Sequence, residues 1–164
     1  MNFFANHNAH QDDWSVLRPD MGSEDIWNVQ ELYSDDSIQA MILEMSVFFN
    51  ATHFITSQSG VQGILHRHSF QFSVTAQYKR NSDGQFFVPF EDFKNVLNDI
   101  SRFYEGKLLN ELPVFREKQS TTENFVKVLA YQLERLIKEL PLEINELSLH
   151  ESPTVGVKLI IRHE

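Results

Sequence analysis

Three histidines in this chain have a spacing that suits a metal site. His53 precedes the triplet His66-Arg67-His68 by the length of one loop. Catalytic zinc sites use three protein ligands and leave a fourth position open, and imidazole is a common ligand. The pattern therefore predicts a metal held by His53, His66 and His68. Zn²⁺ is the first choice because imidazole suits it and the chain has no cysteine, while iron, nickel and copper stay open as alternatives.

The residues from His66 onward alternate between two kinds of side chain. One parity carries His66, His68, Phe70, Phe72, Val74, Ala76 and Tyr78, and the other parity is mostly polar. A period of two predicts a half-buried strand. On it, the two histidines point inward with Cα atoms roughly 6.6 Å apart. The run from Met41 to Ile55 is rich in β-forming residues and carries His53 near its end, so a hairpin would bring all three imidazoles together. Taken singly, each histidine is better explained as a core or interface residue.

Length and charge exclude several classes of protein. A chain of 164 residues with 41% hydrophobic side chains has the size of one domain with a sizeable core. Its net charge of -9 argues against nucleic acid or an anionic membrane as the main partner. No apolar run approaches the roughly 18 residues of a membrane span. The first residues lack the pattern of a secretion signal, so a cytoplasmic location is expected.

Residues 1–38 differ in composition from residues 39–164. They are rich in Asn, Asp, Ser and Gln, with isolated aromatic residues. This composition indicates an N-terminal extension, either docked on the domain or a neighbouring subunit, or a partly disordered arm. Residues 39–164 are then the single folded domain.

Two helices are predicted between the first pair of strands and a second pair. Apolar residues recur at helical spacing from Phe90 to Phe103, and a second stripe runs from Phe125 to Leu140. The second helix is predicted to begin with a capping box, Ser120 to Glu123, and to stop at Pro141. Short strands follow at 144–149 and 155–162. The order β-β-α-α-β-β predicts an α+β domain, with a four-stranded antiparallel sheet and both helices on one face.

Five short motifs together resemble the 6-pyruvoyl tetrahydropterin synthase and 6-carboxytetrahydropterin synthase family. In chain order they are Phe49-Asn50-Ala51-Thr52-His53, Leu65-His66-Arg67-His68-Ser69-Phe70, Leu109-Asn110, Ser120-Thr121-Thr122-Glu123-Asn124 and His150-Glu151-Ser152. The resemblance implies the tunnelling fold, in which subunits join their sheets into a barrel. It also implies a homo-oligomer, commonly a hexamer of two stacked trimers, whose open sheet edges pair between subunits.

The resemblance also implies a chemistry. Enzymes of this family are zinc-dependent lyases that act on 7,8-dihydroneopterin triphosphate. His53, His66 and His68 match their zinc ligands. Glu151 matches the carboxylate that anchors the pterin, since two carboxylate oxygens can accept from two adjacent donors of its amino-pyrimidine edge. Substrate contacts are further expected from Thr121, Thr122 and Gln62.

The chain departs from the family pattern at its proton-transfer groups. Gln62 stands where the family has its general base, typically cysteine, and an amide cannot abstract a proton. Glu105 and Gly106 stand where an Asp-His dyad is expected. Glu105 or a water activated by the metal is then the candidate base. Glu123 is explained first as a helix cap, and His150 as a structural residue on the opposite face of its strand.

Two functions remain open from the sequence. One is a divergent zinc-dependent pterin lyase that uses Glu105 or a metal-activated water. The other is a zinc-containing oligomeric protein that binds a pterin or a purine-like molecule without turnover. The retained metal ligands favour the first, and the missing proton-transfer groups favour the second.

Overall fold

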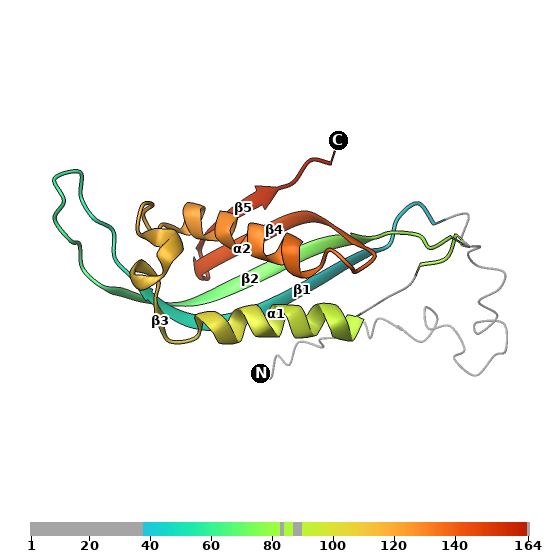
Figure 1. Ribbon diagram of the computed structural model, residues 1–164, viewed down its shortest axis with the longest axis horizontal. Helices are drawn as coiled ribbons and strands as arrows, with labels where there is room; N and C mark the ends of the chain where they lie inside the picture. The colour runs from blue at the N-terminus through green and yellow to red at the C-terminus, as the bar shows by residue number, and fades with distance from the viewer. Residues whose placement is uncertain (1–37, 83, 87–89, 164) are drawn as a thin grey trace, which may run out of the picture. The chain divides into compact units, whose positions relative to one another are not determined.

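Two helices cover one face of a five-stranded sheet (Figure 1). The computed structural model describes residues 38–82, 84–86 and 90–163. In chain order the elements are β1 (Ile42–His53), β2 (His66–Tyr78), α1 (Phe90–Tyr104), β3 (Lys107–Leu108), α2 (Thr122–Leu136), β4 (Leu142–Ser152) and β5 (Val155–Ile160). The predicted α+β class is confirmed. The extension predicted over 1–38 lies, apart from Ile38, outside the described residues.

The prediction of a four-stranded, wholly antiparallel sheet is wrong in one respect. The strand order is β3-β1-β2-β4-β5, and β3 pairs with β1 in parallel. The chain leaves α1 through Gly106, whose φ of 71° favours glycine, and its N–H donates to the Asn50 carbonyl at 2.7 Å. β3 contains only two residues. Such a strand is too short to show a period of two, and for this reason the sequence pattern did not predict it.

The inward parity of β2 forms the centre of the core. Phe70, Phe72 and Ala76 are fully buried, as the alternation predicts. The helices pack onto this face through a continuous apolar cluster that includes Phe49, Phe93, Leu97, Tyr104, Phe125, Leu129 and Leu133. Burial of apolar area of this kind is the main stabilising term in folding.

The buried face of each helix differs slightly from its predicted stripe. α1 buries Phe93, Leu97, Ile100 and Tyr104, whereas Phe90 and Phe103 are exposed.

α2 is capped by Thr121, whose side chain accepts from the Asn124 N–H, so the predicted capping box that begins at Ser120 is wrong by one residue. The helix ends at Leu136, before Pro141. Neither helix has both the length and the apolar character that crossing a membrane requires.

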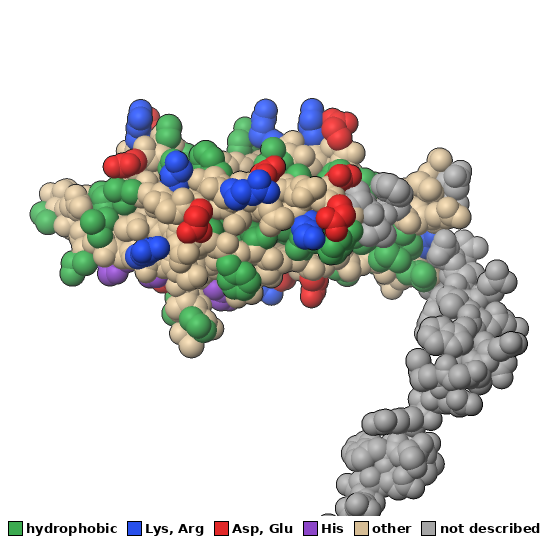
Figure 2. Space-filling model, turned by 90° about the horizontal axis from the view of Figure 1, so that it is seen from below, with side chains coloured by type: hydrophobic (Ala, Val, Ile, Leu, Met, Phe, Trp, Pro, Cys, Tyr) green, Lys and Arg blue, Asp and Glu red, His purple; other side chains and the backbone are tan. Residues whose placement is uncertain are grey.

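Charged side chains of both signs are interspersed over the side of the molecule shown in Figure 2. Some form exposed ion pairs along a helix, such as Lys94 with Glu91 at 3.5 Å. Such pairs contribute between nothing and about 1 kcal/mol. The stability of the domain therefore depends on its core.

The pairing of His150 with Gly156 across β4 and β5 predicts a steric effect. The imidazole of His150 lies over Gly156, so that a Cβ at position 156 would collide with the ring. We expect Gly156→Ala to lower the free energy of unfolding by about 1–3 kcal/mol, the usual cost of overpacking. Urea denaturation measures the loss. The double variant Gly156→Ala/His150→Ala should recover most of it, and no recovery would contradict the assigned cause.

Candidate metal and ligand site

The hairpin register places the three predicted histidines on one face of the sheet. His53 pairs directly with His66, and Ala51 pairs with His68. Residues directly opposite in an antiparallel pair share a face. The ring centroids of His53 and His68 lie 5.1 Å apart, and that of His66 lies 6.0 Å from His68 and 6.2 Å from His53. The structure therefore brings the three rings together at one end of β1 and β2.

The three histidines differ in burial, which sets the inner and outer sides of the site. His53 is 5% exposed, His68 is partly buried and His66 is exposed. The His53 Nδ1 lies 2.6 Å from the Ser120 carbonyl oxygen. A carbonyl only accepts, so Nδ1 must carry the hydrogen. In the neutral imidazole, Nε2 then presents its lone pair. This is the arrangement in which a backbone carbonyl orients a metal-binding imidazole.

A carboxylate completes the cluster. The ligand atoms of His53, His68 and Glu151 all lie within 4.8 Å of one another. Thr122, at the start of α2, donates a hydrogen bond of 2.6 Å to Glu151 Oε2. Imidazoles and a carboxylate form a donor set that zinc accepts. Together with the fixed tautomer of His53, this donor set fits the metal that the sequence predicts.

The cluster lines a pocket of about 320 Å³. The wall contains His53, Ile55, His66, His68, Thr121, Thr122, Glu123 and Glu151. Sequence reasoning missed Ile55 and assigned Glu123 to helix capping alone. The pKa of Glu123 is lowered by its own backbone N–H and by the Thr121 side chain, which agrees with a role at the helix start. Its place in the pocket wall is an additional finding.

Two amide side chains hold the segment that follows His53. Asn110 accepts from the Phe54 N–H and donates to the Phe54 carbonyl, both at 2.9 Å. Gln119 binds Thr56 in the same two-sided way, at 2.8 and 2.6 Å. Each amide side chain forms the pair of backbone hydrogen bonds that an adjacent strand would form. These bonds fix the extended backbone beyond His53, the last residue of β1. Asn110 belongs to a motif visible in the sequence, but nothing in the sequence pattern indicated Gln119.

Gln62 lies in the connection between β1 and β2. It is exposed and forms an isolated bridge with Thr56. Gln62 does not belong to the lining of the histidine pocket, whereas Thr121 and Thr122 do.

Glu105 is also absent from the pocket wall formed by the described residues of one chain. Its carboxylate accepts from the Asn50 backbone N–H at 2.8 Å and from the Asn50 side-chain amide at 3.1 Å. Both bonds favour the charged form and lower the pKa of Glu105 below its ordinary 4.5. Within one chain, Glu105 thus supports the turn between α1 and β3.

The lowered pKa of Glu105 predicts an acid-dependent stability. A carboxylate whose pKa is lower in the folded state stabilises the fold above its unfolded pKa, and this contribution is lost as pH falls through the folded value. We therefore expect Glu105→Gln to lower the free energy of unfolding at neutral pH and to make little difference well below pH 4.5. Denaturant titrations across this range measure the difference. Glu117→Gln, at another exposed glutamate, is the matched control, and an equal effect of both variants would disprove the prediction.

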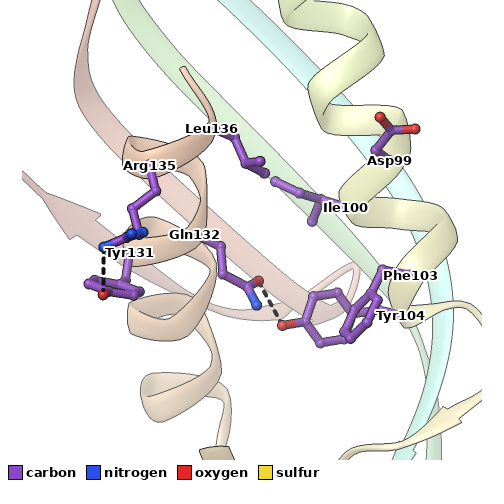
Figure 3. A pocket seen from close by; sticks show the side chains of 8 residues that line it. All are labelled: Asp99, Ile100, Phe103, Tyr104, Tyr131, Gln132, Arg135 and Leu136. Carbon is purple, nitrogen blue, oxygen red and sulfur yellow. Dashed lines mark hydrogen bonds between the residues drawn. The ribbon is translucent and has the colours of Figure 1, made fainter. Parts of the chain in front are cut away.

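A larger hollow, of about 440 Å³, lies between α1 and α2 (Figure 3). Phe103, Tyr104, Tyr131 and Leu136 make much of its lining, and the Tyr104 hydroxyl donates to Gln132 Oε1 at 2.8 Å. Burial raises the pKa of Tyr104 to about 12, against a smaller lowering by Gln132. A tyrosine with so high a pKa stays neutral at ordinary pH. The histidine pocket is smaller, but it gathers three imidazoles and two carboxylates, and it is the better candidate site.

Comparisons with known proteins give one family model and a set of similar folds. Residues 42–160 match the family model described as 6-pyruvoyl tetrahydropterin synthase. The 6-pyruvoyl tetrahydropterin synthase of Caenorhabditis elegans superposes with a TM-score of 0.63 at 13% identity, over 76% of this chain and 98% of that one. The Plasmodium falciparum enzyme gives 0.54 at 22% identity, over 73% and 99%. No curated protein matches the sequence. At these identities, the two structures establish the fold alone.

Proposed function

Because this chain belongs to the 6-pyruvoyl tetrahydropterin synthase family, we propose that it is a zinc-dependent carbon-oxygen lyase acting on 7,8-dihydroneopterin triphosphate or a related dihydropterin. The observation that carries the proposal is the meeting of His53, His68 and Glu151 in one pocket. These residues come from β1, β2 and β4, so the fold itself assembles them.

The histidines would hold the metal and the protein backbone would hold the histidines. His53 is positioned by the Ser120 carbonyl, and His66 and His68 are positioned by the pairing of β2 with β1. Bound zinc would supply a Lewis acid that stabilises negative charge developing on oxygens of the substrate side chain.

Glu151 would bind the pterin by accepting hydrogen bonds from its amino-pyrimidine edge. Thr122 donates to Oε2 and so restricts the rotation of the carboxylate. A carboxylate has about four lone-pair positions, so this bond leaves acceptors for the ligand. Thr121 and Thr122 would contact the ligand from the start of α2, since both line the pocket. Gln62 would reach the ligand from the connection between β1 and β2.

Proton transfer is the step for which the residues depart from the family pattern. We propose Glu105 as the base, on its position in the sequence motif. To act as the base, the Glu105 carboxylate must either break its hydrogen bonds to Asn50 or enter the histidine pocket of a second copy of the chain. Glu105→Gln is then expected to reduce turnover by about 10²- to 10⁴-fold with zinc content unchanged. Product formation and bound zinc should be measured on the same sample, and full activity would exclude Glu105 as the base.

A second candidate function is pterin binding without turnover. It is favoured by a specific observation, the two hydrogen bonds that tie Glu105 to Asn50 outside the pocket. The uncharged Gln62 at the position of the family base favours it as well. In this case, the metal and Glu151 would serve recognition alone.

One experiment separates the two functions. Purified zinc-loaded protein is incubated with 7,8-dihydroneopterin triphosphate, and released triphosphate and pterin products are followed by mass, with apo-protein as the control. Zinc-dependent product supports the lyase. Binding without product supports the second function, and neither binding nor product contradicts both.

We also propose that the chain assembles through its sheet edges into a homo-oligomer, a hexamer by its family. β5 lies at one end of the strand order and exposes Val155 and Ile160, which are 52% and 69% accessible. Long unpaired edges promote pairing with another chain. Light scattering of the purified protein measures the mass, and a monomer at micromolar concentration would contradict this assembly.

A further inference from the structure

The position of the Glu151 carboxylate points to a second role besides pterin binding. Its oxygen lies within 4.8 Å of the ligand atoms of His53 and His68, which themselves lie within that distance of each other. Ligands of a tetrahedral zinc ion are about 3.3 Å apart, as follows from zinc-ligand distances of about 2.0–2.1 Å. Side-chain shifts of about 1–2 Å would thus bring all three groups into one coordination sphere.

His66 lies farther from this centre than Glu151 does. It is not part of the group of mutually close ligand atoms, and its ring centroid is 6.0 Å or more from both other rings. It is also exposed, at the first residue of β2. The inner part of the site consists of two imidazoles and a carboxylate, and His66 would join from the rim.

The surroundings of Glu151 suit a metal ligand. Thr122 donates to Oε2, which leaves Oε1 as the oxygen best able to coordinate a cation. Carboxylates that bind a metal usually accept a hydrogen bond from a neighbouring group as well, and this hydrogen bond orients the carboxylate. The metal would then have four protein ligands, namely three histidines and one carboxylate. Four protein ligands fill a tetrahedral site and leave no open position for water or substrate.

We propose that Glu151 is an exchangeable metal ligand, which coordinates the zinc in the resting protein and moves to the pterin when the pterin binds. This inference rests on the proposed function, because it requires both a metal and a pterin in the pocket. Its consequence is that the metal acquires an open position only when the ligand is present. Glu151 thereby couples occupancy of the pocket to exposure of the metal.

Metal affinity tests the first half of the proposal. Full-length apo-protein is titrated with zinc in competition with a chromophoric chelator, for the unsubstituted protein, Glu151→Gln and Glu123→Gln. The control changes the same chemical group in the same pocket wall, outside the cluster of ligand atoms. We expect Glu151→Gln to weaken zinc binding at least about tenfold, since even outer partners of ligands contribute about 10- to 100-fold. Glu123→Gln should change the zinc affinity by less than about tenfold, which is the lower end of that range.

The absorption spectrum of the cobalt-substituted protein tests the second half. Visible bands of Co²⁺ depend on the number and type of its ligands, so Glu151→Gln should change the spectrum without any pterin. Addition of 7,8-dihydroneopterin to the unsubstituted protein should also change it. If Glu151→Gln and Glu123→Gln give equal affinities and unchanged spectra, Glu151 is not a ligand and the proposal is overturned, while the proposed function stands. If the unsubstituted protein binds no zinc, the proposed function itself fails.

Discussion

Replacement of His53 with alanine is expected to weaken zinc binding by more than about a hundredfold and to remove any zinc-dependent turnover. His53 is the most buried histidine of the cluster, and its Nδ1 donates to the Ser120 carbonyl. Loss of an outer partner alone costs about 10- to 100-fold in metal affinity, so loss of a ligand should exceed this range. Zinc content after dialysis and competition with a chelator measure the effect.

A matched histidine gives the control for this prediction. His150 is adjacent to Glu151 in sequence, but its side chain packs over Gly156 and it is absent from the ligand cluster. His150→Ala should therefore retain zinc. Circular dichroism of both variants checks that the fold is kept. Equal zinc binding by the two variants would show that the histidine pocket does not hold the metal.

Truncation of Phe125 is expected to produce the largest loss of stability. The side chain is fully buried, and its ring lies 4.8 Å from Tyr104, 5.5 Å from Phe70 and 5.9 Å from Phe49, measured between centroids. Phe125→Ala removes most of these contacts and leaves a cavity between α2 and the sheet. Changes of this kind cost about 3–5 kcal/mol. Denaturant unfolding followed by circular dichroism measures the loss.

The exposed Phe103 provides the comparison for Phe125. It lies on the neighbouring helix α1 and is 52% accessible, so Phe103→Ala should cost well under half as much. A similar cost for both variants would mean that the aromatic cluster is not the centre of the core.

Phe70 links this cluster to the metal site, since its ring also contacts those of His53 and His68. Loosening of the core at Phe125 should therefore also weaken zinc binding, though less than loss of His53 does.

Much of the fold could be predicted because its strands and helices have clear periods. The alternation from His66 to Tyr78 coincides with β2, and the burial of Phe70, Phe72 and Ala76 follows from it. The α+β class and the placement of both helices on one face also follow from the order of these periods. β3 and the exact start of α2 did not follow. A two-residue strand has no period, and the Ser120 hydroxyl donates to the distant Phe54 carbonyl at 3.3 Å, so the cap of α2 falls on Thr121.

The sequence by itself determined which residues are available as ligands and on which face of their strands they lie, because side chains alternate along a strand with a fixed period. Only the tertiary structure decided which of them meet. The pairing of β4 with β2 and of β2 with β1 placed Glu151 nearer to His53 and His68 than His66 is. The turn between α1 and β3 placed Glu105 beside Asn50. Distances between residues far apart in the chain depend on strand pairing and packing, and no local pattern of residue types encodes them.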